Sequence, residues 1–164
     1  MDNNYIFQYW EAIQDGTVTV GKWIKTIYEI LVNGLKSGKW DFDEEKANKA
    51  INFIENFCHH SEGRNDLLKL ELWQKAIVSA IFGIMDKRTG YRQFREVFIV
   101  VARKNGKTLF AAAIAAYMAY IDGEYGAKVY FLAPKLDQAD LVYDAFYQIV
   151  QADDELDSIT KKRR

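Results

Sequence analysis

Apolar positions in the first part of the chain recur at three- and four-residue steps, which is the spacing of helices with one buried face. Residues 5–15 have an uneven apolar spacing that suits a short helix, and residues 20–35, where the three- and four-residue steps are regular, predict a longer one. A third helix is expected over residues 41–58, where Asp41 and Glu44 have the spacing of a capping box and acidic residues occupy the first turn. The pattern therefore predicts a leader made of helices.

A polar run over residues 59–66 interrupts this pattern and is the best candidate boundary in the chain. We therefore expect an α-helical N-terminal leader over residues 1–66 and a second part over residues 67–164. The second part opens with an amphipathic segment at residues 67–85. The mostly charged residues 153–164 are expected to be frayed.

The pattern changes at residue 94, where β-branched and aromatic residues follow one another as in a strand. Residues 94–101 predict this strand, and the alanine-rich residues 109–120 predict the helix after it. A second strand is expected over residues 128–133, stopped by Pro134, and a last helix over residues 138–152. The order strand, helix, strand, helix predicts a parallel pair of strands with a right-handed crossover, and so an α/β fold.

The first strand runs directly into Gly106, Lys107 and Thr108 at the start of the alanine-rich helix. A strand, a tight loop and a helix N-terminus are how proteins bind phosphate groups with backbone N–H groups. In such a loop Lys107 would neutralise the β- and γ-phosphates of a nucleotide, and the Thr108 hydroxyl would ligate Mg²⁺. The usual first glycine is replaced by Val101, so the alternative is a surface turn with an incidental Lys-Thr pair.

Composition limits the classes of protein to which the chain can belong. Its 164 residues are 49% hydrophobic and 15% aromatic, which favours a packed core over disorder, and the net charge of −1 argues against bulk electrostatic binding of nucleic acid. The single cysteine, Cys58, excludes an internal disulfide and suits a reducing compartment. Neither a secretion signal nor a membrane-spanning run is visible, so a soluble cytoplasmic protein without a membrane partner is expected.

The sequence Cys58-His59-His60 suggests a metal site at first sight. Adjacent residues seldom converge on one ion, and no second pair of cysteines exists to complete a tetrahedral set. A metal at these residues is therefore not expected.

Three signals stand in one order along the chain, and together they are more specific than any one of them. They are Leu-Glu-Leu-Trp-Gln at 70–74 with Ile-Phe-Gly at 81–83, then Val-Val-Ala-Arg-Lys-Asn-Gly-Lys-Thr at 100–108, then Leu-Ala-Pro at 132–134 with Gln-Ala at 138–139. In this arrangement the chain resembles the N-terminal part of the large terminase subunit of tailed bacteriophages. The resemblance covers essentially all of the chain. It implies a partial P-loop NTPase of the RecA-like (ASCE) type, with a parallel sheet preceded by the helical leader, and with ATP and Mg²⁺ as cofactors.

The resemblance also implies roles for single residues. Gln74 matches the adenine-recognising glutamine, whose amide can both donate and accept, and Trp73 would pack or stack beside it. Arg103 and Lys107 match the residues that act on the phosphate charge during catalysis, and Thr108 matches the metal ligand. The complete nucleotide-binding set implied is Trp73, Gln74, Arg103, Lys104, Asn105, Gly106, Lys107 and Thr108.

The residues taken alone leave plainer alternatives open. Trp73 lies on an apolar stripe and could be ordinary core, and Gln74 could be an exposed helix residue. Arg103 and Lys104 could be solvated loop charges.

The complete protein implied by the resemblance is an ATP-driven DNA translocase and endonuclease that packages viral DNA into procapsids. Its implied partners are double-stranded viral DNA, the portal and the small terminase subunit, and it would work as a ring of identical subunits in the host bacterial cytoplasm. This sequence contains no apolar strand that ends in Asp-Glu, which such ATPases need for Mg²⁺ and the attacking water, and no acidic cluster of a nuclease domain.

We therefore expect the chain alone to bind nucleotide weakly without turning it over. The strand before the phosphate loop should then have an unpaired apolar edge prone to self-association. Two alternatives remain at this point: a fragment of a helicase-like P-loop nucleic-acid ATPase, and a non-catalytic remnant that serves only as a protein-binding module.

Overall fold

A computed structural model describes residues 4–60 and 66–161 of the chain. It contains two compact units, which are described separately. Unit 1 consists of Met1–Ile51 and Leu70–Phe98, and unit 2 consists of Asn52–Lys69 and Ile99–Arg164. No helix in the described residues is long and apolar enough to cross a membrane.

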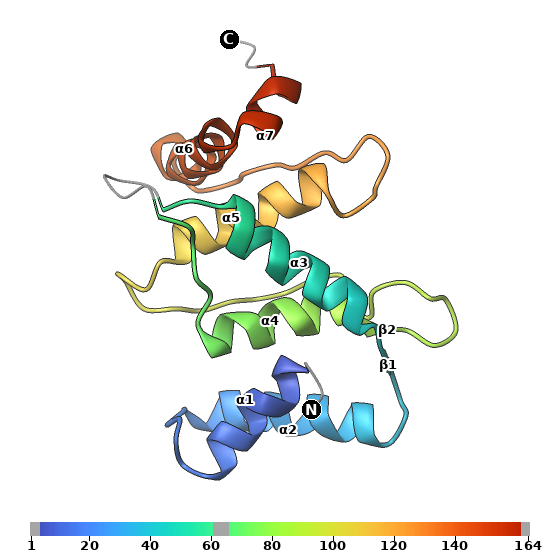
Figure 1. The fold of residues 1–164 in the computed structure, drawn as a ribbon. Helices are drawn as coiled ribbons and strands as arrows, with labels where there is room; N and C mark the ends of the chain where they lie inside the picture. Colours follow the sequence, from blue (N-terminus) through green and yellow to red (C-terminus); the bar gives the residue numbers. More distant parts are fainter. Residues whose placement is uncertain (1–3, 61–65, 162–164) are drawn as a thin grey trace. The chain divides into compact units, whose positions relative to one another are not determined.

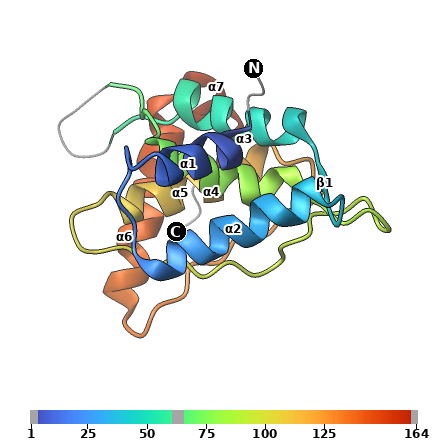
Figure 2. The ribbon, with the colours of Figure 1, turned by 90° about the horizontal axis from the view of Figure 1, so that it is seen from below.

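Unit 1 is built around three helices, α1 (Tyr5–Gln14), α2 (Lys22–Lys36) and α4 (Leu72–Gly83). Helix α1 packs against both α2 and α4 (Figures 1 and 2). Tyr9 of α1 and Tyr28 of α2 meet edge to face, with ring centroids 4.7 Å apart. The buried core comprises Ile6, Tyr9, Ile13, Tyr28, Leu31, Val32, Trp40, Ala76 and Ile84. All three helices were expected from their apolar spacing.

A short ladder closes unit 1 at one end. Strands β1 (Asp41–Phe42) and β2 (Ile84–Met85) pair antiparallel, and Asp43 N donates to Gly83 O at 2.8 Å. Asp41 therefore lies in a strand, and its expected place in a capping box was wrong. Asp43 has the capping role, because its Oδ1 accepts from Lys46 N at 3.0 Å.

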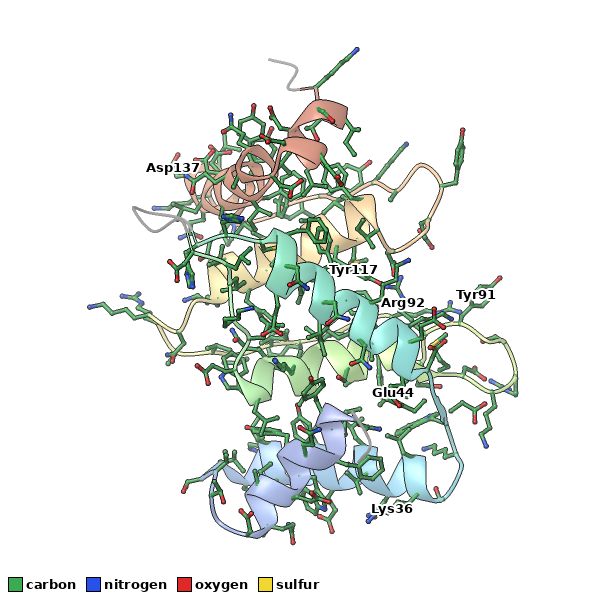
Figure 3. The ribbon with its side chains drawn as sticks, viewed as in Figure 1. Lys36, Glu44, Tyr91, Arg92, Tyr117 and Asp137 are labelled. Atoms are coloured by element: carbon green, nitrogen blue, oxygen red, sulfur yellow. The ribbon has the colours of Figure 1, made fainter. Side chains whose placement is uncertain are left out.

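Helix α3 (Glu44–Phe57) follows this cap, begins in unit 1 and ends in unit 2. In unit 1, the loop after β2 folds back on that strand: Gln93 N donates to Ile84 O at 2.9 Å. The Arg92 guanidinium then lies over the Phe82 ring, 5.3 Å from its centroid (Figure 3). This cation–π contact holds the loop after β2 against α4.

Unit 2 is built on α5 (Lys107–Tyr120), which packs against α6 (Leu136–Ala152). The small side chains of α5 let the two helices approach closely. The buried ones are Ala112, Ala113, Ala115 and Ala116. Aromatic rings complete the core: Tyr120 stacks on Phe146 with ring centroids 6.2 Å apart. The ring of Tyr117, which Figure 3 labels, has its centroid 5.8 Å from that of Phe53. The alanine-rich pattern predicted α5 within two residues of its observed start.

Part of the charged tail that is expected to be frayed is a helix, and residues 162–164 of that tail lie outside the described residues. Helix α7 (Asp154–Ile159) begins where Asp153 Oδ1 accepts from Glu155 N and Leu156 N at 3.1 and 3.0 Å. Leu156 is buried, and α7 packs against α6. This charged segment therefore contains an N-cap residue, Asp153, and a buried apolar residue, Leu156, and these two stabilise the helix.

The two strands expected around the phosphate loop are not present as strands. Residues 94–101 and 128–133 form no ladder, and the sheet of the described chain is the two-stranded pair β1–β2, so the structure does not show a parallel sheet. Phe98 and Leu132 are 93% and 92% exposed. Residues 127–132 still alternate between half-buried and exposed, and Phe131 packs on Phe146 at 5.9 Å. The segment has the side-chain alternation of a strand without a neighbour to bond.

Helix α4 contains a buried hydroxyl that should reduce stability. Ser79 is fully buried, and its Oγ has no hydrogen-bond partner in the described structure. Because an orphaned buried hydroxyl costs about 1–3 kcal/mol, Ser79→Ala should raise the free energy of unfolding by about 1 kcal/mol in denaturant titration. Ser158→Ala is the matched control, since Ser158 Oγ donates to Glu155 O at 2.8 Å, and it should not stabilise. A lower stability for Ser79→Ala would contradict the absence of a partner.

Cys58 in unit 2 should make stability fall at alkaline pH. Burial, with a smaller contribution from the Asp153 charge, raises the pKa of its thiol from 9.0 to about 12. The folded state thus favours the neutral thiol. The stability that this preference contributes is fully present below pH 9.0 and is lost as the pH rises toward about 12. Between these values the free energy of unfolding should fall by up to about 1.4 kcal/mol per pH unit more than in Cys58→Ala. Parallel pH profiles for the two proteins would refute this.

Candidate functional site

The loop before α5 has two residues in the left-handed region of backbone conformation. Lys104 has φ 66° and Gly106 has φ 65°, and Lys104 is the non-glycine residue with positive φ in the described chain. The Asn105 side chain holds the loop from within, because its Nδ2 donates to Ala102 O at 3.3 Å and to Arg103 O at 3.2 Å. A left-handed lysine costs about 1 kcal/mol or more, so the loop keeps a conformation that is not the local minimum.

Gly106 is the residue from which α5 begins. Its carbonyl accepts the first helical hydrogen bond, from Phe110 N at 2.9 Å, and no side chain caps the helix. The first-turn N–H groups, including those of Lys107 and Thr108, are therefore left without a side-chain acceptor. Together with the positive end of the helix dipole, they favour an anion at this point.

The side chains of the loop add positive charge to this helix end. Arg103, Lys104 and Lys107 are exposed, and none forms an ion pair within the described residues. The half-buried Thr108 has no hydrogen-bond partner for its hydroxyl in the same part of the chain. Free cations and backbone donors fit phosphate groups, and a free hydroxyl at the second helical position fits a ligand of Mg²⁺.

Carboxylate ligands for a metal are not assembled near this loop. The described residues contain no group of three or more His, Cys, Asp or Glu side chains that could hold a metal ion. A Mg²⁺ ion here would take its ligands from the nucleotide phosphates and from water. From this part of the chain it would take the Thr108 hydroxyl.

The residues expected to bind a base, Trp73 and Gln74, lie in unit 1 at the start of α4, whereas Arg103 to Thr108 lie in unit 2. Trp73 is half-buried and packs against the core of unit 1, so the plainer interpretation as a core residue accounts for part of its surface. Gln74 is buried, with 8% of its surface exposed, and is not the exposed helix residue of the plainer alternative.

Gln74 also has a structural partner that the sequence analysis missed. Its Oε1 accepts from Glu71 N at 2.9 Å, and the Glu71 side chain accepts from the backbone N–H of Gln74, which completes a capping box. The signal was present as Glu-x-x-Gln at the start of an apolar run. It was overlooked because a capping box usually begins with Ser or Thr.

Two comparisons with known proteins indicate the family of the chain. A family model described as terminase large subunit, ATPase domain, matches residues 72–164. Among solved structures, the crystal structure of the HK97 bacteriophage large terminase is similar with a TM-score of 0.58 and 26% sequence identity. No curated protein matches the chain.

The similarity to the HK97 protein covers 70% of this chain and 22% of the HK97 chain. The sequence thus corresponds to less than a quarter of that large terminase. Because the family model spans more than half of the 164 residues and includes the loop and helices α5, α6 and α7, the chain belongs to the family of the terminase large subunit ATPase domain.

Proposed function

We propose that this chain is the ATP-binding part of a phage terminase large subunit, the motor that packages viral DNA into procapsids. The observation that carries the proposal is the loop before α5, where two left-handed residues, an uncapped helix N-terminus and three unpaired cations occur together in a terminase family member. Residues 1–66 would be its helical leader, and residues 67–164 the N-terminal portion of the ATPase domain.

In the proposed site the loop binds the triphosphate. Backbone N–H groups from Lys104 to Thr108 would bind phosphate oxygens, with Asn105 holding the loop in shape and Gly106 allowing the backbone to approach. Lys107 would neutralise the β- and γ-phosphates, and Arg103 would respond to the γ-phosphate charge. Thr108 would hold Mg²⁺, which supplies charge neutralisation at the phosphates when bound.

The base would be bound by the residues at the start of α4. Gln74 would read the polar edge of adenine through its carboxamide, and Trp73 would supply apolar surface next to it. The plainer role of Trp73 in the core is compatible with this, because the residue is only half-buried.

We also propose that residues 94–101 and 128–133 are strands of a parallel P-loop sheet when their neighbours are present. The support is the alternation of half-buried and exposed side chains over residues 127–132 and the strong β-propensity of both segments. Without a paired neighbour, neither segment can satisfy its backbone in a ladder.

The complete protein would be a DNA-translocating ATPase and endonuclease. It would act on double-stranded viral DNA in the host cytoplasm, with the portal and the small terminase subunit as partners, and as a ring of identical subunits. This chain has no apolar strand ending in Asp-Glu, so we propose that it binds nucleotide without turnover.

Membership of the terminase family separates this proposal from the helicase-like alternative. A non-catalytic, protein-binding module remains the second candidate, favoured by the exposed apolar side chains Trp23, Ile27 and Ile30 on α2. Nucleotide binding decides between the two.

The central test is binding of ATP with Mg²⁺ to the full chain by calorimetric titration. The chain should bind, and Lys107→Ala should weaken binding by at least about tenfold, which corresponds to about 1.4 kcal/mol, because a charge-assisted contact to the phosphates is lost. Lys128→Ala is the matched control, since Lys128 is an exposed lysine of unit 2 outside the loop, and it should leave affinity unchanged.

Equal loss in both lysine variants would mean that general charge, and not the loop, attracts the nucleotide. A stably folded chain that binds no adenine nucleotide would favour the protein-binding module. Steady ATP hydrolysis by the purified chain that depends on Lys107 would disprove the proposed lack of turnover.

A further inference from the structure

The carboxamide of Gln74 has a fixed orientation in the structure. Its Oε1 accepts from Glu71 N at 2.9 Å, and only the oxygen of an amide can accept an N–H. The reciprocal bond from the Gln74 backbone to the Glu71 side chain closes the capping box. The oxygen end and the nitrogen end of this carboxamide are therefore not interchangeable, as they would be in an unrestrained glutamine.

The nitrogen end of the same group makes no hydrogen bond within the described residues and keeps some contact with solvent, while Gln74 as a whole is 8% exposed. Nε2 has no hydrogen-bond partner in residues 4–60 and 66–161. It is not sealed from solvent either, because the buried polar side-chain atoms without a partner there are His59 Nδ1 and Ser79 Oγ. The carboxamide thus presents a free donor next to an oxygen that has a second lone pair.

This pair of groups matches one purine better than the other. Adenine presents its N6 amino donor beside a ring-nitrogen acceptor, whereas guanine presents the O6 acceptor in place of the amino group. With the oxygen fixed, adenine can donate N6–H to Oε1 and accept from Nε2. Guanine in the same placement would bring O6 against Oε1. A glutamine free to rotate its amide by half a turn could instead donate to O6.

We propose that the backbone N–H of Glu71 is a positioning group that makes Gln74 select adenine over guanine. The inference rests on the proposed function, because it takes Gln74 as the residue that binds the base. It goes further by assigning the selectivity to a helix-capping hydrogen bond and not to the side chain of Gln74 alone.

The test compares two substitutions at one position. Glu71 has φ −65° and ψ 156°, a conformation that proline also adopts. Glu71→Pro therefore removes the backbone N–H while the backbone keeps its φ angle. Glu71→Ala is the matched control, since it removes the carboxylate and keeps the N–H. Affinities for ATP and GTP with Mg²⁺ are measured on the full chain, with inorganic triphosphate as a probe that has no base.

The wild-type chain and Glu71→Ala should both prefer ATP over GTP by about tenfold or more, the range expected for one bidentate base contact. In Glu71→Pro this ratio should fall to about twofold or less, through weaker ATP binding and equal or stronger GTP binding. Affinity for triphosphate should not change in any variant. A merely structural defect would weaken ATP, GTP and triphosphate together.

A preserved ATP preference in Glu71→Pro, or an equal loss in Glu71→Ala, overturns the inference while the proposed function stands. A wild-type chain that binds neither ATP nor triphosphate overturns both. If Glu71→Pro does not fold, exchange of the Glu71 amide hydrogen by NMR decides: it should be at least about tenfold faster in Gln74→Ala than in the wild type. Equal exchange rates would show that the fixing hydrogen bond is not formed.

Discussion

Backbone N–H and C=O groups that leave water must find partners, and this requirement organises the chain. Its helices satisfy the requirement internally except at their ends. Within residues 4–60 and 66–161, side chains complete four helix N-termini, through Asn4, Asp43, Glu71 and Asp153. Helix α5 begins at Gly106 without such a cap. A phosphate group is an acceptor that can complete this helix end, so an unmet structural need coincides with the proposed function.

An uncapped start is not enough to define a site, because α2 and α6 also begin without a side-chain cap. What distinguishes α5 is the loop before it. Two left-handed residues and the Asn105 side chain shape the backbone, and Arg103, Lys104 and Lys107 surround it with unpaired positive charge. Strain at Lys104 has no packing explanation in an exposed loop, and a ligand that bonds the backbone there would supply one.

The sequence predicted the helices well, because their signals are local. Apolar residues at helical spacing identified α1, α2, α3 and α5 with small errors at their ends. The errors lie at cap residues: the capping role expected of Asp41 belongs to Asp43, and Asp153, expected in a frayed tail, is the N-cap of α7. Capping depends on a single side chain and on one backbone angle, so several nearby polar residues compete for the role and spacing alone does not decide between them.

The strands are a different case, because β-propensity says nothing about a partner. Residues 94–101 have the composition of a buried strand, yet Phe98 and Val100 are exposed and no ladder forms in the described chain. A strand is stabilised by its neighbours, and the 22% of the HK97 large terminase to which this chain corresponds leaves most of that protein unmatched. The turn before α5 could be located from the sequence because its backbone is shaped by residues next to it in the chain, whereas its binding of phosphate stays a proposal.

The first turn of α4 shows why part of the site could not be read from residue types. Gln74 was assigned a chemical role and Glu71 none, although the two residues form one hydrogen-bonded unit. A glutamine side chain in water can present either end of its amide, so residue identity alone does not determine which purine it prefers. The cap removes that freedom. In this turn the stability of the helix and the selectivity of the proposed base contact therefore depend on the same backbone hydrogen bond, and a change that weakens one should weaken the other.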